Sequence, residues 1–168
     1  DAVVEGTHFL PDTEPLRIGH KAIGRVLSDF AAMGGAPAWA LVDLVAPASM
    51  EMERLEAIYL GARTLAGPHG LRIVGGDTAS GPVLELHVFG MGWVAAGKAM
   101  LRSGARPGDR IFVTGALGGS SGGKHLDFEP RVTEGRWLGE SGFVTAMIDV
   151  SDGLIADRGY ADGQAAPH

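Results

Sequence analysis

The sequence predicts an α+β fold in which helices cover one face of a mixed, mainly antiparallel sheet. Segments with strand-like and helix-like spacing of apolar residues follow one another in the order β-α-β-α-β-β over residues 1–94. Of the 168 residues, 45% are hydrophobic, which is enough to bury a core. We expect a first domain over residues 1–98, and a linker and incomplete second domain over residues 99–168.

The apolar residues at the start of the chain indicate a strand followed by a long helix. Residues 1–10 form a strand-like run that Pro11 closes. From Ile18 to Gly34 the apolar side chains recur as they do on one face of an amphipathic helix. Gly35 and Pro37 stop this helix.

A second helix and several short strands complete the predicted elements. The helix follows Ser49 and ends at Gly67-Pro68, because that pair favours a turn. The remaining strands are predicted at residues 39–45, 71–74, 83–94, 110–114 and 146–150.

The charge and residue composition exclude several classes of protein. The net charge is −6, whereas a protein that wraps nucleic acid needs a basic face. No apolar run reaches the roughly 18–20 residues that cross a bilayer, and no leader opens the chain. We therefore expect a cytoplasmic protein that binds neither nucleic acid nor membrane. The absence of cysteine leaves oxygen and imidazole ligands for metals, which favours Mg²⁺.

Asp29 has a geometric argument of its own. At about 100° per residue it falls between Ile18 and Ala22, inside the apolar arc of the first helix. A carboxylate there should be buried or lie in a cleft, and burial without a partner costs several kcal/mol. An ion pair with Arg25 or a bound cation would meet this need, and both stay open.

Three more aspartates follow strand-like segments. Asp77 comes after two glycines, and Asp149 and Asp152 lie where another predicted strand ends. Each has an ordinary structural explanation, an Asx turn at Asp77 and a helix cap at Ser151 or Asp152. The helix N-terminus after Asp152 would also attract phosphate. Together with Asp29, these carboxylates predict a site where several Mg²⁺ ions bind nucleotide phosphates.

Two other patterns carry less weight. Gly118 to His125 nearly matches the phosphate-binding sequence G-x-x-x-x-G-K-[ST], but His125 replaces the hydroxyl and residues 126–130 do not continue as an apolar helix. The six histidines show no pairing at metal-ligand spacing. His8, at the end of the first strand beside Phe9, is a candidate substrate contact.

Six motifs together resemble thiamine-monophosphate kinases in their order and spacing. Each motif is weak alone, and the six span about residues 1–157. They are Asp1-Ala-Val-Val-Glu-Gly-Thr-His-Phe9, Leu27-Ser-Asp-Phe-Ala-Ala-Met-Gly34, Val74-Gly-Gly-Asp-Thr78, Arg102-Ser-Gly-Ala-Arg-Pro-Gly-Asp109, Val113-Thr-Gly115 and Met147-Ile-Asp-Val-Ser-Asp-Gly-Leu154.

The resemblance implies a fold, an activity and a set of site residues. The fold is that of aminoimidazole-ribonucleotide-synthetase-like proteins, whose sheets pair across a homodimer, and the activity is ATP- and Mg²⁺-dependent phosphorylation of thiamine monophosphate. The implied metal ligands are Asp1, Asp29, Asp77, Asp149 and Asp152. The implied ATP contacts are Tyr59, Gly76, Asp77, Arg102 and Ser151, and the implied substrate contact is His8. Members of this family also carry an upstream Gly-Asp-Asp-Ala-Ala-like segment and a longer C-terminal part, so we expect that this chain is a fragment.

The implied reaction needs no general base, because the acceptor phosphate is already ionised at neutral pH. Catalysis is then positioning and charge neutralisation for direct in-line transfer, and no catalytic base or nucleophile is assigned. Two alternatives stay open. One is another ATP-dependent member of the superfamily, such as selenophosphate or aminoimidazole ribonucleotide synthetase. The other is a noncatalytic dimerising fragment.

Overall fold

Residues 1–161 are described by the computed structural model, with side chains described through residue 157. They form two units, each built from separate stretches of the chain. The first unit comprises residues 1–26, 37–92 and 118–130, and the second comprises residues 27–36, 93–117 and 131 onward. The domain boundary at residue 98 stays a prediction, since segments from both sides of it enter each unit.

The sheet is mixed. Its strands are β1 (Ala2–Val4), β2 (Ala36–Ala46), β3 (Arg72–Gly75), β4 (Thr78–Ser80) and β5 (Glu85–Trp93). The order is β1-β5-β2-β3, and β4 also pairs with β2. β1 runs antiparallel to β5, whereas β2 pairs in parallel with β3 and with β4. The predicted order β-α-β-α-β-β is confirmed except for β4, a 3-residue strand that the sequence pattern did not indicate. The pattern also did not indicate the parallel pairings of β2 with β3 and β4.

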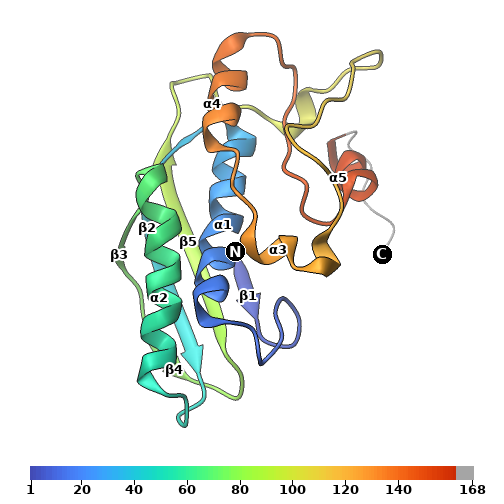
Figure 1. Ribbon diagram of the computed structural model, residues 1–168. Coiled ribbons are helices and arrows are strands. Elements are labelled where there is room, and N and C mark those ends of the chain that lie inside the picture. Colours follow the sequence, from blue (N-terminus) through green and yellow to red (C-terminus); the bar gives the residue numbers. More distant parts are fainter. Residues whose placement is uncertain (162–168) are drawn as a thin grey trace. The chain divides into compact units, whose positions relative to one another are not determined.

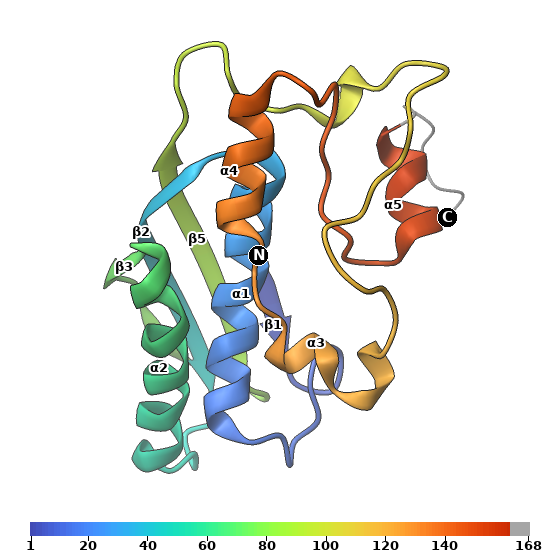
Figure 2. The same cartoon turned by 45° about the horizontal axis from the view of Figure 1, so that its top comes forward.

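Helices α1 (Pro15–Met33) and α2 (Met52–Ala66) lie side by side on one face of the sheet (Figures 1 and 2). The residues of β2 alternate accordingly. Val42 and Leu44 are buried, whereas Trp39 and Leu41 are exposed on the other face. The two predicted helices are confirmed, α1 starting three residues earlier than Ile18.

Glycines allow α1 and α2 to approach closely. A Cβ atom at Gly19 would lie 1.9 Å from the carbonyl oxygen of Ile58, and one at Gly61 would lie 2.0 Å from that of Leu16. Any side chain at either position would therefore push the helices apart. The fully buried Ile18, Ile23 and Ile58 pack in the core that this contact closes.

Four short elements and two further helices complete the described chain. They are η1 (Gly67–His69), η2 (Arg102–Gly104), η3 (Ser120–Gly122), α3 (Lys124–Asp127), α4 (Val132–Ser141) and α5 (Leu154–Ala161). The predicted strands at residues 110–114 and 146–150 are wrong, because both segments are irregular. A strand exists only when a neighbour accepts its backbone hydrogen bonds, and neither segment has such a neighbour within residues 1–161. Phe112 is 84% exposed as a result.

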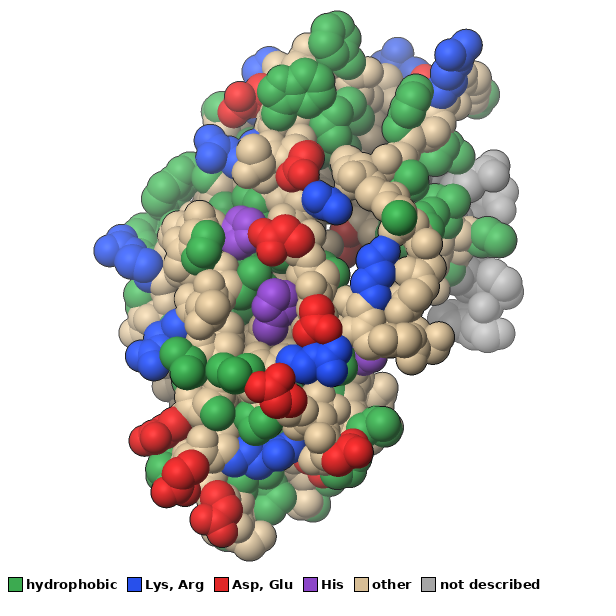
Figure 3. Space-filling model, in the orientation of Figure 1, with side chains coloured by type: hydrophobic (Ala, Val, Ile, Leu, Met, Phe, Trp, Pro, Cys, Tyr) green, Lys and Arg blue, Asp and Glu red, His purple; other side chains and the backbone are tan. Residues whose placement is uncertain are grey.

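Within residues 1–161, no helix has both the length and the apolar character needed to cross a membrane. Acidic, basic and apolar side chains are interspersed on the side of the molecule seen in Figure 3.

Candidate functional site

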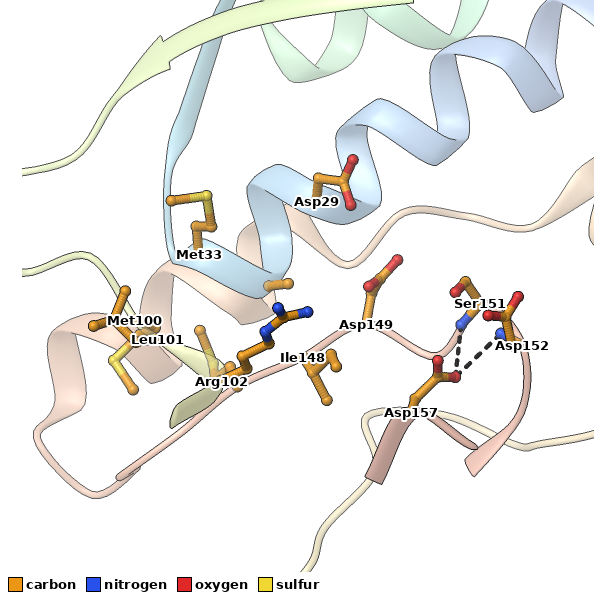
Figure 4. A pocket seen from close by; sticks show the side chains of 12 residues that line it. Asp29, Met33, Met100, Leu101, Arg102, Ile148, Asp149, Ser151, Asp152 and Asp157 are labelled. Carbon is orange, nitrogen blue, oxygen red and sulfur yellow. Dashed lines mark hydrogen bonds between the residues drawn. The ribbon is translucent and has the colours of Figure 1, made fainter. Parts of the chain in front are cut away.

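A cavity in the second unit gathers five of the predicted site residues. Its volume is about 670 Å³. The predicted residues that line it are Asp29 from α1, Arg102 from η2, and Asp149, Ser151 and Asp152 from the segment before α5. Figure 4 shows the side chains of Asp29, Asp149 and Arg102 facing the same space. Residues far apart in the sequence thus meet around one opening.

Asp29 is exposed at this cavity and not buried in the core. The helical periodicity placed it on the apolar face of α1, and at this end of the helix that face borders the cavity, with Met33 on the same lining. The cleft alternative for Asp29 is therefore confirmed. An ion pair between Arg25 and Asp29 stays a prediction, and Arg25 donates hydrogen bonds to the Ala2 carbonyl at 2.9 Å and to Asp1 at 3.3 Å.

Asp149 is held by a neighbour on α1. The Ser28 hydroxyl donates a hydrogen bond to Asp149 Oδ2 at 2.9 Å, and both side chains are partly buried. This bond fixes one carboxylate oxygen and leaves the other able to accept a further ligand. Ser28 lies within one of the six motifs, but the sequence predicted no role for it, because no local pattern indicates its contact with Asp149, 121 residues away.

Asp157 holds the turn between Asp149 and α5. Its carboxylate is buried, and Oδ2 accepts hydrogen bonds from the backbone amides of Ser151 and Asp152 (Figure 4). The same oxygen accepts a third hydrogen bond from the Gly153 amide. We expected amides in this region to attract phosphate, but Asp157 occupies these three. Sequence reasoning also missed Asp157, although a carboxylate in the first turn of a predicted helix is a usable signal.

The first unit contains the other predicted residues, Asp1, His8, Tyr59, Gly76 and Asp77. Gly76 has φ of 149°, and a Cβ atom there would lie 1.8 Å from the carbonyl oxygen of Val42. The turn after β3 therefore requires glycine at this position. Asp43 Oδ1 accepts a hydrogen bond from the Asp77 amide at 3.0 Å, and Asp77 Oδ1 accepts one from the Thr78 amide at 2.8 Å. The Asx turn considered for Asp77 is not what these bonds form, because the Asp77 carboxylate accepts from the amide of the next residue and not from the amide two residues on.

Tyr59 lines a second cavity, of about 850 Å³, in the first unit. Leu44, Ile73 and Thr78 from the sheet and several α2 side chains form the rest of its wall. Burial raises the pKa of the Tyr59 hydroxyl, and the negative charge of Asp43 raises it further. Tyr59 is therefore neutral at pH 7 and can donate a hydrogen bond to a ligand in this cavity.

His8 lies in a polar cluster of the first unit. Its Nδ1 accepts a hydrogen bond from the Val4 amide at 3.0 Å. Burial lowers the pKa of His8, and the charges of Arg25 and Lys21 lower it further, so the ring is neutral at pH 7. Lys21 donates to the His8 carbonyl and lies 2.6 Å from His125 Nδ1, and burial lowers the pKa of Lys21 to about 8.

The glycine-rich segment from Gly118 to His125 does not form a phosphate-binding loop of the expected kind. No strand leads directly into it, since residues 94–117 contain none, and the helix that follows, α3, has only 4 residues. Arg17 instead ties the segment to α1 by hydrogen bonds to the Gly123 carbonyl and the Asp127 carboxylate. The failure of the motif's context, predicted from the sequence, is confirmed.

The donor chemistry of the cavity in the second unit fits Mg²⁺. Asp29, Asp149 and Asp152 offer carboxylate oxygens, which are hard ligands. Within residues 1–161, no three carboxylate or imidazole groups are close enough to enclose a metal ion without other ligands. Mg²⁺ at nucleotide sites commonly takes one or two carboxylates, with phosphates and water completing its shell. These aspartates fit a cation shared with a bound phosphate.

The chain is similar to known proteins over nearly its whole length. Residues 1–94 match the family described as AIR synthase related protein, N-terminal domain. Thiamine-monophosphate kinases of Salmonella typhimurium and Rhodopirellula baltica are 38% and 42% identical to it. These alignments cover 95% and 94% of this chain, and 54% and 50% of those proteins. The chain therefore spans about half the length of the curated relatives that it matches.

A solved structure shares the same fold. The structure described as AaThiL complexed with AMPPCP and TMP has a TM-score of 0.91 and 30% sequence identity, over 98% of this chain and 59% of that one. The aminoimidazole-ribonucleotide-synthetase-like α+β fold expected from the sequence is confirmed by this likeness and by the family match.

Proposed function

Because the chain belongs to the AIR synthase related family, we propose that it is part of an ATP-dependent kinase that converts thiamine monophosphate to thiamine diphosphate. The kinases of Salmonella typhimurium and Rhodopirellula baltica support this substrate. The relative bound to AMPPCP and TMP supports a site that holds a nucleotide and the acceptor together.

The cavity in the second unit carries the proposal. Four aspartates and one arginine line this space, which under the proposal accepts nucleotide phosphates. One of the four, Asp157, accepts hydrogen bonds from backbone amides, which leaves Asp29, Asp149 and Asp152 for a ligand. Carboxylates repel phosphates, so the site needs cations between them. Bound Mg²⁺ ions would neutralise the phosphate charge, each held on the protein side by one or two of Asp29, Asp149 and Asp152.

The other residues of the cavity position the phosphates for transfer. The Arg102 guanidinium can donate paired hydrogen bonds to phosphate oxygens, and the Ser151 hydroxyl can donate one more. An oxygen of the acceptor phosphate attacks the γ-phosphorus, and the bond from that phosphorus to the bridging oxygen of ADP breaks. The attacking oxygen carries no proton at neutral pH, so no side chain acts as a base.

Residues of the first unit complete the assignment. We assign Tyr59, Gly76 and Asp77 to the nucleotide, Asp1 and Asp77 also to Mg²⁺, and His8 to thiamine monophosphate. Because the neutral His8 ring accepts a hydrogen bond from the Val4 amide at Nδ1, its other nitrogen carries hydrogen and can donate a hydrogen bond to an uncharged group of that substrate.

The protein is proposed to act as a cytoplasmic homodimer. Trp39, Leu41, Phe89 and Met91 expose apolar surface on the sheet face that α1 and α2 leave uncovered. Exposed apolar patches of this kind mark protein interfaces.

The test uses the full-length protein that contains this chain. With ATP, Mg²⁺ and thiamine monophosphate, we expect thiamine diphosphate and ADP in equal amounts, measured by chromatography. Asp149→Asn should lower turnover by about a hundredfold or more, because it removes charge that holds the cation. Glu134→Gln, at an exposed α4 residue that pairs with Arg131, is the control. Failure of the unsubstituted protein to form thiamine diphosphate would overturn the proposal.

A further inference from the structure

We infer that Asp157 is a positioning residue that makes the turn over residues 149–153 a cation-facing surface. Asp157 is 3% exposed and has no part in the reaction proposed above. Burying a carboxylate costs free energy unless hydrogen bonds compensate its charge, so the donors that surround Asp157 indicate what it does. The inference rests on the proposed function for the identity of the ligand.

One oxygen of Asp157 organises the whole turn. Oδ2 accepts hydrogen bonds from three consecutive amides, those of Ser151 at 3.0 Å, Asp152 at 3.1 Å and Gly153 at 3.0 Å. The backbone curls around this oxygen, aided by Gly153 at φ of 125°. The turn cannot rotate without breaking all three bonds. The side chains of Asp149 and Asp152, which line the cavity, therefore keep their directions.

The same bonds decide the sign of charge that the turn attracts. Three successive amides facing outward would attract a phosphate. Here they face the Asp157 carboxylate, and the side chains of Asp149 and Asp152 face the cavity. The turn thus presents carboxylate oxygens to the ligand and keeps these amides away from it. The backbone of the turn faces away from the phosphates, its carboxylates face the cation of a metal–nucleotide complex, and the direct phosphate contacts come from side chains such as those of Arg102 and Ser151.

Substitutions at Asp157 separate this role from general support of the fold. Because all three backbone amides donate to the same oxygen, the side-chain amide oxygen of the Asp157→Asn protein can still accept the three hydrogen bonds. Asp157→Ala removes the acceptor and releases the amides toward a phosphate. Asp157→Glu keeps the charge but displaces the oxygen by one methylene.

The measurement is calorimetric titration of the full-length protein with AMPPCP, with and without Mg²⁺. The quantity of interest is the ratio of the dissociation constant without Mg²⁺ to that with Mg²⁺. We expect Asp157→Ala and Asp157→Glu to lower this ratio about tenfold or more, and Asp157→Asn to keep it within about threefold. A residue that only supports the fold would weaken both titrations alike and leave the ratio unchanged.

A matched control is Asp109→Ala in the same unit. The exposed Asp109 also holds a turn, by accepting hydrogen bonds from the Arg106 amide at 2.9 Å and the Thr145 hydroxyl at 2.6 Å, but it does not line the cavity. We expect it to leave the ratio unchanged. If Asp157→Ala fails to fold by circular dichroism, Asp157→Glu decides the question.

The two proposals fail in different ways. An unsubstituted protein that binds AMPPCP no better with Mg²⁺ than without it overturns the proposed function, and this inference with it. If Asp157→Ala and Asp157→Glu keep the ratio of dissociation constants of the unsubstituted protein, the inference about Asp157 is overturned and the proposed function stands.

Discussion

At the scale of single residues, the proposed site depends on polar contacts that hold the aspartates in place. Ser28 fixes Asp149, Asp43 binds the Asp77 amide, and Asp157 binds the turn beside the cavity. The predicted metal ligands supply the negative charge of the site, and these three residues fix the positions of the segments that carry those ligands. Their substitution should alter ligand affinity more than it alters stability.

Ser28→Ala tests the support of Asp149. Removing the hydroxyl frees Asp149 Oδ2 to reorient, so we expect Mg²⁺-dependent AMPPCP binding to weaken about three- to tenfold. The loss of one partly buried hydrogen bond should lower the free energy of unfolding by only about 1 kcal/mol. Calorimetry and urea unfolding measure the two effects. Ser141→Ala, which removes a serine hydroxyl bound to the Leu138 carbonyl on α4, serves as the control. Equal binding by Ser28→Ala and the unsubstituted protein would contradict the assignment.

Lys21 should give the first unit a distinct pH dependence. Its pKa falls from a usual value of 10.5 to about 8 because burial disfavours the charged amine, and Arg25 adds repulsion. Between these pH values the unfolded chain binds more protons than the folded one, so stability from this group rises with pH. Below pH 8 the penalty is fully present, and above about pH 10.5 it is gone.

The measurement compares the unsubstituted protein with Lys21→Met. Subtracting the two free energies of unfolding removes the other titrating groups, and the difference should change by about 2–3 kcal/mol in favour of the unsubstituted protein between pH 8 and 10.5. His8 and His125 also face Lys21, but burial lowers the pKa of both, so they stay neutral across this range. Lys98→Met, at an exposed lysine, is the control. A difference that does not vary with pH would refute the assignment.

At the scale of elements, the sequence was most informative where periodicity and glycine agreed. The apolar spacing from Ile18 to Gly34 predicted α1, and Gly67-Pro68 marked the end of α2. Residues 110–114 and 146–150 have the composition of strands, but composition cannot supply a pairing neighbour, and both segments are irregular. Helix α4 was missed because its apolar residues are few and Gly135 interrupts it. Local propensity therefore predicted the two long helices, whereas a strand-like segment became a strand only where a neighbouring strand could pair with it.

The close contact between α1 and α2 can be tested by comparing substitutions at two glycines, Gly61 within α2 and Gly67 at the C-terminal cap of α2. Gly61→Ala places a Cβ atom 2.0 Å from the Leu16 carbonyl oxygen, so the helices must separate. We expect the free energy of unfolding to fall by about 2–4 kcal/mol, measured by urea denaturation. Gly67→Ala is the control, since no atom lies within 4 Å of its Cβ position and its φ of −56° suits alanine. It should change stability by less than about 1 kcal/mol. Comparable losses in both variants would show that close helix packing is not the cause.

At the scale of the whole molecule, the predicted site residues are divided between the two units. The sequence predicted which residues line the cavity of the second unit better than it predicted the contacts that position them. The resemblance selected Arg102 and Ser151, the helical periodicity supported Asp29, and placement at a predicted strand end supported Asp149 and Asp152. One cavity contains all five. Asp43 and Asp157 were missed because their roles arise from contacts between segments and within a tight turn.

The homodimer proposed above predicts a specific loss of assembly. Phe89 on β5 is 60% exposed and Met91 is 47% exposed, beside Trp39 and Leu41 on the neighbouring strand β2. Phe89→Glu would place a charge within this apolar surface, and desolvating that charge at an interface costs several kcal/mol. Sedimentation equilibrium of the full-length protein should show a dimer that Phe89→Glu converts largely to monomer. Leu10→Glu, a similarly exposed leucine outside the sheet, should remain dimeric. A Phe89→Glu protein with an unchanged dimer mass would exclude this sheet face as the interface.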